Sequence, residues 1–351
     1  MNKLLLFLCI VFCSILNAQN NNTIQHHHKQ KNKTIQTAQH SKHNNKHSNK
    51  HSNKHKPKMS NTRAANIELK ASIASIPKAQ VKAQPHTNIP NDYENKDAIK
   101  SGPRLYSYSA IAVNADTGEI FVSKNPDTKL PIASLTKLMT AMVVLDSGVN
   151  LDDYVTISTS DIDTLRNTRS RLKVGMQLRR RDLLLLALMS SENRAAHALG
   201  RTTYSTGGLG MFVDKMNEKA KSLGMENTQF FDPTGLTNRN RSTAMDLAKM
   251  VQSAYSYNEI RKYTTTKNAN VMFSPKYIHH YINTDALVRG NQMQIEVSKT
   301  GFISEAGHCL ALYSIINNKP IVMVFLNSAG KSGRLIDAMT IKNYVKKIYS
   351  S

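Results

Sequence analysis

Cysteine is scarce in this sequence, and this scarcity limits how the fold can be stabilised. Three cysteines occur among 351 residues, at Cys9, Cys13 and Cys309. The first two lie in the apolar run 4–16, which follows a positively charged start and precedes Ala18, an arrangement typical of a secretory signal cut near that alanine. Once the signal is removed, a single cysteine is left. No intramolecular disulfide is then possible, and the fold depends on a hydrophobic core.

Long apolar runs are also lacking. The run inside the expected signal peptide, residues 1–18, is too short to cross about 30 Å of hydrocarbon comfortably, and no other stretch is long and apolar enough to do so. Neither cysteine of that run has a convincing lipoprotein context. We therefore expect secretion across the inner membrane into the periplasm or cell envelope, without a retained membrane or lipid anchor.

Acidic residues are few: 24 Asp and Glu stand against 47 Lys and Arg, which gives a formal net charge of +23. The segment 19–100 holds 15 of the basic residues and 4 of the acidic ones, so its charge density is well above that of the rest. Such charge favours adhesion to polyanions without specifying a fold. For an exported protein the available polyanions are wall polymers and the membrane surface, and no nucleic acid partner is expected.

Large apolar residues are rare in segment 19–100, where Asn, His, Lys, Gln and Ser dominate, so we expect a disordered basic tail. A degenerate repeat places His43, His47, His51 and His55 four residues apart. On a helix these imidazoles would share one face and could bind Zn, Cu or Ni. Asn and Ser are poor helix formers, however, and the interleaved lysines repel a cation. A spacer that becomes more cationic below pH ~6.5 is favoured over a metal site.

The remainder, residues 101–351, has the apolar periodicity of a folded domain. It predicts strands over 106–114, 119–123, 293–298, 308–315 and 320–326. It predicts helices over 131–145, 182–189, 211–223, 243–251 and 333–348. A strand pair, a helical middle, an antiparallel meander and a closing helix that covers the sheet make an α+β fold.

Three short motifs occur in order along this domain: Ser134-Leu-Thr-Lys137, Ser191-Glu-Asn193 and Lys299-Thr-Gly301. Each is weak alone, because Ser-x-x-Lys occurs four times, Ser-x-Asn occurs twice, and a Lys-Ser-Gly sequence at 331–333 rivals the third motif. Context selects among them. Ser134 opens a long amphipathic helix, where backbone N–H groups point at developing negative charge, and Lys299 directly follows an apolar strand.

The first motif indicates a nucleophile with its base. The Ser134 hydroxyl needs a base to take its proton, and Lys137 shares its helix face. An ordinary lysine, with a pKa of ~10.4, is protonated at neutral pH. Burial and a second cation, Lys299, are therefore expected to lower the pKa of Lys137.

The third motif indicates a binding site for an extended peptide. If the strand that carries Lys299–Gly301 lies at the edge of the sheet, it could pair with such a peptide. Lys299 and Thr300 could then hold the terminal carboxylate of the peptide, and Gly301 would let the peptide backbone approach.

The ordered trio resembles penicillin-binding proteins and serine β-lactamases. Flanking segments extend the likeness to the D-alanyl-D-alanine carboxypeptidase family: 116–119, 131–140, 172–175, 220–228, 232–236 and 242–244. Residues 190–196, 299–302 and 305–310 are most similar to the endopeptidase branch, the penicillin-binding protein 7 type. The resemblance implies a β-lactamase/transpeptidase-like fold, with an antiparallel sheet flanked by helices and a helical subdomain.

The resemblance also implies roles for individual residues. Ser134 would attack the D-alanyl carbonyl to form an acyl-enzyme, with Lys137 as base and Ser191 as the proton relay to the leaving amine. Backbone N–H groups of Ser134 and Phe302 would form the oxyanion hole. Substrate binding is assigned to Asn193, Lys299, Thr300, Gly301 and Phe302. The implied partners are peptidoglycan peptides, with β-lactam antibiotics as inhibitors, and neither a cofactor nor a metal is required.

Two other functions are compatible with parts of the sequence. A serine β-lactamase uses the same motifs but also needs a glutamate that activates the deacylating water, and no persuasive Glu-x-x-x-Asn-type loop lies between Asn193 and Lys299. A non-catalytic wall- or metal-binding protein would act through its basic tail, which the intact trio argues against. Carboxypeptidase and endopeptidase action share one acylation machinery. The short stretch after Lys299, with no room for a further C-terminal domain, favours the endopeptidase type.

Two minor expectations concern residues outside the trio. Cys309 lies in an apolar strand and is expected to be packed rather than reactive. The run Arg179–Arg181 is expected to be a solvated helix entry.

Overall fold

The computed structural model describes residues 102–274 and 277–350. The expected signal peptide, the basic tail and its histidine repeat lie outside the described residues. Within the described ranges, no helix is both long and apolar enough to span a bilayer.

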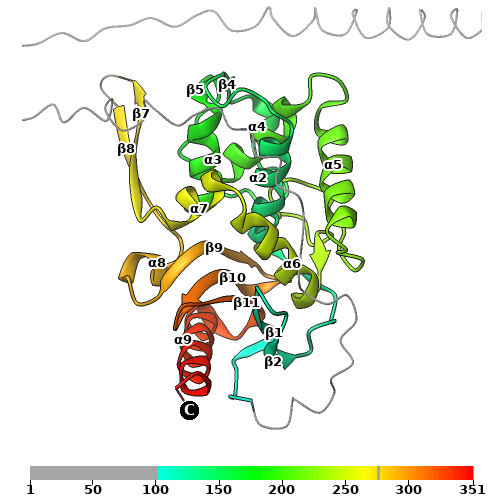
Figure 1. The fold of residues 1–351 in the computed structure, drawn as a ribbon. Helices are drawn as coiled ribbons and strands as arrows, with labels where there is room; N and C mark the ends of the chain where they lie inside the picture. Colours follow the sequence, from blue (N-terminus) through cyan, green and yellow to red (C-terminus); the bar gives the residue numbers. More distant parts are fainter. Residues whose placement is uncertain (1–101, 275–276, 351) are drawn as a thin grey trace, which may run out of the picture. The chain divides into compact units, whose positions relative to one another are not determined.

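A five-stranded antiparallel sheet forms the centre of the domain, with strand order β2-β1-β11-β10-β9 (Figure 1). Its strands are β1 (Ser107–Asn114), β2 (Ile120–Lys124), β9 (Gln294–Ile303), β10 (Gly307–Ile316) and β11 (Lys319–Ser328). The predicted strand pair and meander are confirmed. The pairing of β1 with β11, from Ser107 opposite Ser328 to Asn114 opposite Ile321, joins the two ends of the domain in one sheet.

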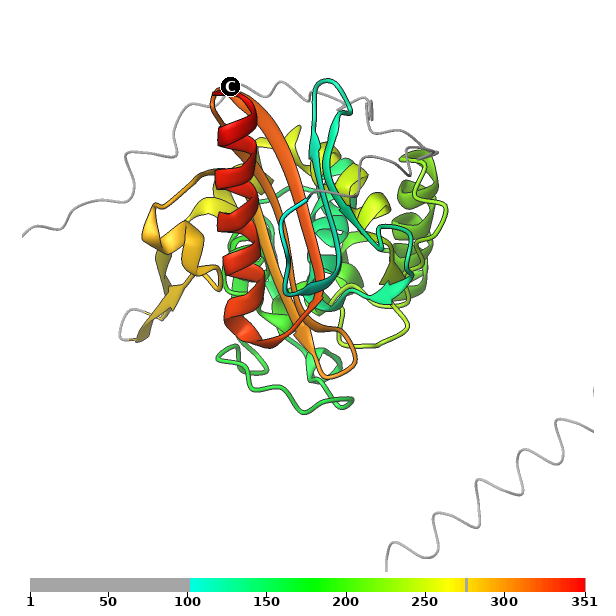
Figure 2. The same cartoon turned by 90° about the horizontal axis from the view of Figure 1, so that it is seen from below.

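Helix α9 (Gly330–Ile348) covers one face of this sheet (Figure 2). Because side chains alternate along a strand, one set of strand residues faces this helix and the other set faces away. The buried cluster on the α9 side includes Leu310, Leu312, Met323, Phe325, Ala338, Ile341 and Val345. The predicted closing helix is confirmed, and it begins three residues earlier than expected.

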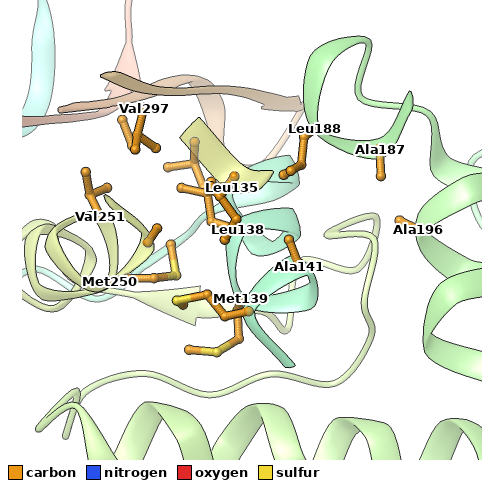
Figure 3. Packing of buried hydrophobic residues seen from close by; sticks show 14 of the residues in the cluster. Leu135, Leu138, Met139, Ala141, Ala187, Leu188, Ala196, Met250, Val251 and Val297 are labelled. Atoms are coloured by element: carbon orange, nitrogen blue, oxygen red, sulfur yellow. The ribbon is translucent and has the colours of Figure 1, made fainter. Parts of the chain in front are cut away.

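A helical lobe covers the opposite face (Figure 1). Its helices are α2 (Thr136–Asp146), α3 (Arg180–Met189), α4 (Asn193–Thr203), α5 (Gly208–Ser222), α6 (Ala244–Tyr255) and α7 (Asn258–Thr265). Leu135 and Leu138 pack there near Met250, Val251 and Val297, so the lobe and the sheet share one core (Figure 3). The helices predicted over 182–189, 211–223 and 243–251 are confirmed as α3, α5 and α6.

Short elements complete the domain. They are η2 (Ala133–Leu135), η3 (Thr159–Asp161), α8 (Ala286–Gly290), β3 (Leu130–Pro131), β4 (Tyr154–Thr156), β5 (Gln177–Arg179), β6 (Arg241–Ser242), β7 (Asn268–Ser274) and β8 (Tyr277–Ile282). β7 and β8 form a hairpin that the sequence analysis did not predict.

Three expectations were wrong in detail. The helix expected from 131 begins at Thr136, because Pro131 pairs in a short ladder and Ala133 has a left-handed φ of 48°. The strand expected to end at 298 continues through Ile303, so Lys299 lies inside it. Arg180 is buried and donates to Thr202, because the helix start turns it inward, away from solvent.

The expectation for Cys309 is confirmed. Its side chain is buried, and burial raises its pKa to about 11.

Candidate active site

Ser134 lies in the short 3-10 helix η2, between β3 and α2. The turn is held from two sides. Thr136 Oγ1 donates to the carbonyl of Ala133 at 2.8 Å, and a Cβ placed on Gly235 would lie 1.9 Å from the same carbonyl oxygen. Gly235 also has a φ of 79°, which favours glycine. The loop that contains Gly235 therefore touches the backbone beside the serine, and a side chain at that position would displace it.

Lys137 lies on the first turn of α2 and is 1% exposed. Its Nζ lies 2.9 Å from Ser134 Oγ, 2.8 Å from Asn193 Oδ1 and 2.6 Å from the carbonyl oxygen of Thr234. Burial lowers the pKa of Lys137 from its usual 10.5 to about 7, against the opposing charges of Asp232 and Glu192. Near neutral pH a large fraction of this amine is unprotonated. In that form two N–H groups can donate to Asn193 Oδ1 and to the Thr234 carbonyl oxygen, and the nitrogen lone pair faces Ser134.

Ser191 and Asn193 come from the junction between α3 and α4. Ser191 has a left-handed φ of 60°, an uncommon conformation for a residue with a side chain. Its Oγ accepts a hydrogen bond from Lys299 Nζ at 3.0 Å. The Asn193 amide is oriented by two contacts: its oxygen accepts from Lys137, and its nitrogen donates to Thr168 Oγ1 at 3.0 Å. The junction thus contacts both lysines.

Lys299 lies within β9 and is also 1% exposed. Burial holds its pKa well below the usual value, and the charges of Lys137 and Arg334 lower it further. Burial and Lys299 together were expected to lower the pKa of Lys137. Burial does lower it, as expected, whereas the nearby charges of Asp232 and Glu192 raise it, and the repulsion between the two lysines lowers the pKa of Lys299.

The alternation of β9 divides the third motif between two faces. Lys299 and Gly301 lie opposite Ala311 and Cys309, on the side of the helical lobe, whereas Thr300 lies opposite Leu310. Thr300 Oγ1 donates to Thr284 Oγ1 at 2.7 Å. A Cβ on Gly301 would lie 3.2 Å from Ser134 N, so the strand passes directly beside the serine.

Phe302 ends the predicted set of site residues. Its ring is 57% exposed and stacks on His308, with centroids 4.4 Å apart. Its side chain therefore lies away from Ser134. The structure brings together Ser134, Lys137, Ser191, Asn193, Lys299 and Gly301, but not the side chains of Thr300 and Phe302.

Several residues around the site were not predicted. Asp232 accepts hydrogen bonds from the backbone N–H groups of Thr234, Gly235 and Thr237, and so shapes the turn that presents the Thr234 carbonyl to Lys137. Its Asp-Pro-Thr-Gly sequence is a turn signal, although the signal does not tell what the turn contacts.

Arg334 also supports the site. Its Nη1 donates to the carbonyls of Gly301 and Cys309 at 2.8 Å each. No local sequence pattern marks this arginine, because its acceptors are backbone groups about thirty residues away in β9 and β10. Within residues 102–274 and 277–350, His, Cys, Asp and Glu form no cluster of three that could hold a metal ion.

Known proteins are similar to this chain in sequence and in architecture. A D-alanyl-D-alanine endopeptidase of Pseudomonas aeruginosa is 44% identical over 243 residues, covering 69% of this chain and 78% of that protein. A D-alanyl-D-alanine endopeptidase of Escherichia coli is 42% identical over 247 residues, covering 70% and 79%. The Streptomyces K15 DD-transpeptidase superposes with a TM-score of 0.65 at 31% identity, over 70% of this chain and 98% of that one.

The family comparison covers the folded domain up to the start of α9. Residues 96–330 match the family described as D-alanyl-D-alanine carboxypeptidase, peptidase family S11. The match includes every candidate site residue, and the resemblance inferred from the motifs is confirmed. The chain therefore belongs to the D-alanyl-D-alanine carboxypeptidase family of serine peptidases.

Proposed function

We propose that this chain is a D-alanyl-D-alanine endopeptidase, which hydrolyses cross-links between peptidoglycan stem peptides through an acyl-enzyme on Ser134. Family membership makes it a serine peptidase for D-alanyl-D-alanine peptides. The preference for cross-links rests on the two relatives at 42–44% identity, both named endopeptidases. The observation that carries the chemistry is the 2.9 Å contact between the buried Lys137 amine and the Ser134 hydroxyl.

Acylation begins with the neutral amine of Lys137. Ser134 Oγ gives its proton to Lys137 Nζ as it bonds to the D-alanyl carbonyl carbon. The carbonyl oxygen becomes an oxyanion, for which the backbone N–H groups of Ser134 and Phe302 are the donors, a contribution commonly worth ~3 kcal/mol per donor. Gly301 lets β9 pass close to the turn that carries Ser134, because a Cβ at this position would lie 3.2 Å from Ser134 N.

The leaving amine then needs a proton. Lys137 holds the proton taken from Ser134, and Ser191, which is hydrogen-bonded to Lys299 at 3.0 Å, relays it as the C–N bond breaks. Asn193 keeps Lys137 oriented through its Oδ1. Water next attacks the ester, gives a proton to Lys137 and releases the acyl peptide, and the proton returns to Ser134 Oγ.

The segments that we propose for export of the protein and for its attachment to the envelope lie outside the described residues. Residues 1–18 direct secretion into the periplasm, and residues 19–100 adhere to anionic wall polymers or to the membrane surface. The high positive charge of that segment supports this role.

Muropeptide digestion tests the proposal. The wild type should convert cross-linked dimers to monomers, and Ser134→Ala should lose both this activity and covalent attachment of labelled penicillin. Release of terminal D-alanine alone would make the enzyme a carboxypeptidase, and rapid nitrocefin turnover would make it a β-lactamase. Deletion of residues 19–100 should leave peptidase activity intact. Loss of all function on that deletion would instead favour a binding protein that acts through its tail.

A further inference from the structure

A tight turn lies beside the candidate active site, on the loop between η3 and β5. Asp163 organises it by accepting hydrogen bonds from the backbone N–H groups of Leu165, Arg166 and Thr168, at 2.9–3.0 Å. Thr168 Oγ1 donates to Asp163 at 2.7 Å and also accepts from Asn193. The turn is thus fixed in place and tied to the residue that orients Lys137.

Arg166 extends from this turn to two other elements of the site. Its Nη2 lies 2.9 and 2.8 Å from the two carboxylate oxygens of Glu305, in the turn between β9 and β10. Its Nε donates to the carbonyl of Leu236 at 2.5 Å, next to the glycine that touches the Ser134 turn. The guanidinium therefore lies across the end of β9 that follows Gly301.

The orientation of the bound peptide along β9 decides which part of the substrate lies near the Arg166 guanidinium, and this step rests on the proposed function. β9 is the outer strand of the sheet, so its free edge can accept an extended peptide. With the terminal carboxylate held at Lys299, the peptide runs antiparallel to β9. Its acyl side then passes Gly301 and continues toward Ile303 and Glu305.

We propose that Arg166 is a specificity residue that binds a free carboxylate on the acyl side of the substrate, on the residue that precedes the D-alanine, and that Glu305 occupies this position in the free enzyme. Arg166 Nε donates to the Leu236 carbonyl, so a bidentate contact with a second carboxylate would use the Nη1–Nη2 fork. Nη2 is already held by both oxygens of Glu305, so a substrate carboxylate bound in this way displaces Glu305. The ligand class is an acidic peptide, and the two carboxylates exchange on one guanidinium without any covalent step.

The environment of the pair fits such an exchange. The Arg166 and Glu305 side chains are 22% and 41% exposed, and ion pairs open to solvent contribute little stability. A substrate carboxylate can therefore replace Glu305 without a large cost. The hydrogen bond from Arg166 holds the pKa of Glu305 below its usual range, so Glu305 is charged and competes at neutral pH.

The test uses the full chain and two peptide substrates that differ in one group. One carries a free carboxylate on the residue before the D-alanine, and the other carries a primary amide there. The wild type should prefer the carboxylate in kcat/KM by about fivefold, as for a partly exposed ion pair. Arg166→Gln should abolish the preference, whereas Glu305→Gln should increase it by about a further fivefold, because the competitor is gone.

The opposite signs of the two variants separate recognition from a purely structural contact. Arg169→Gln, an exposed residue of the same loop, removes the same charge and should leave the ratio unchanged. A wild-type ratio of one, or equal losses on both substrates in Arg166→Gln and Glu305→Gln, would overturn the inference. Labelled penicillin tests the proposed function separately: attachment at Ser134 with a ratio of one would mean that this inference alone has failed.

Discussion

The two faces of the central sheet bury different kinds of side chain. On the face covered by α9, Leu312, Phe325 and Ile341 belong to an apolar cluster. On the face covered by the helical lobe, Lys137 and Lys299 are as deeply buried as the aliphatic residues around them. The first face supplies the apolar burial that stabilises the domain, and the second holds two amines whose desolvation costs stability.

The cost on the second face is also what makes the chemistry possible. An unfolded lysine titrates near 10.5, and Lys137 titrates at about 7 in the folded protein. Between these values the unfolded chain binds more protons than the folded one, so this group lowers stability at neutral pH and the loss is relieved as pH rises toward 10.5. The same shift supplies an unprotonated base. Function and stability are therefore opposed at this residue.

Replacing Lys137 with an apolar residue should lower the acylation rate and raise the stability of the fold. We expect Lys137→Met to slow acylation by labelled penicillin by at least about 10³-fold, because the base is lost. The same variant should unfold at a higher urea concentration at pH 7, because a buried charge has been removed. Lys221→Met, at an exposed position of α5, is the control and should change neither quantity. Rapid acylation in Lys137→Met would show that another group serves as base.

The α9 face should respond in the opposite way. Phe325→Ala should lower the free energy of unfolding by about 3–4 kcal/mol, because it leaves a cavity in a fully buried cluster. The acylation rate of the folded fraction should stay at the wild-type value, measured well below the melting temperature. A matched change on the other face, Leu138→Ala, should reduce both stability and rate, because Leu138 adjoins Lys137. Equal rate losses in both variants would remove the distinction between the faces.

The pH dependence of acylation follows from the pKa of Lys137. A base that titrates at about 7 should make the rate rise about tenfold per pH unit below that value and level off above it. Stopped-flow acylation by a chromogenic penicillin between pH 5 and 9 measures the profile. A rate that still rises tenfold per unit at pH 9 would indicate a lysine with an ordinary pKa.

Asp232 should shift this profile slightly. Its charge raises the pKa of Lys137, so Asp232→Asn should move the midpoint to lower pH, by less than about one unit. A modest fall in the maximal rate should accompany the shift, because the amide loses the acceptor for the Thr237 N–H. Asp127→Asn, an exposed position, should leave the midpoint in place. A midpoint that moves to higher pH would contradict the proposed electrostatic effect.

Much of the fold could be predicted from the sequence, because its strands and helices have clear apolar periodicity. The meander at the end of the chain and helix α9 are examples, and Lys137 could be assigned because it lies one turn from Ser134 on the same helix. Helix α4 (Asn193–Thr203) was missed, because its buried face consists mainly of small residues and Leu199 is its only large apolar side chain. The left-handed φ of Ala133, which delays the start of α2, depends on contacts with Gly235 from far along the chain.

The site was less predictable where it depends on backbone groups and on long-range contacts. Lys137 donates a hydrogen bond to the Thr234 carbonyl, and Arg334 donates to the Gly301 carbonyl in β9. Neither contact can be predicted from the local sequence. The lowered pKa of Lys137 and its burial were predicted correctly, but the effect of the neighbouring charges was not, for a similar reason. A pattern of residues shows that two amines are present, but the acidic groups that offset one of them are placed by the fold.

The central claim is that the pKa of Lys137 in the folded protein is about 7, so that about half of this amine is neutral at pH 7, and its titration tests this directly. Lysine Nζ can be followed by nitrogen-15 NMR in the folded wild type, with Lys137→Met used to assign the signal. The account predicts a midpoint near 7 for this residue. A midpoint near 10.5, the value of an exposed lysine, would contradict it.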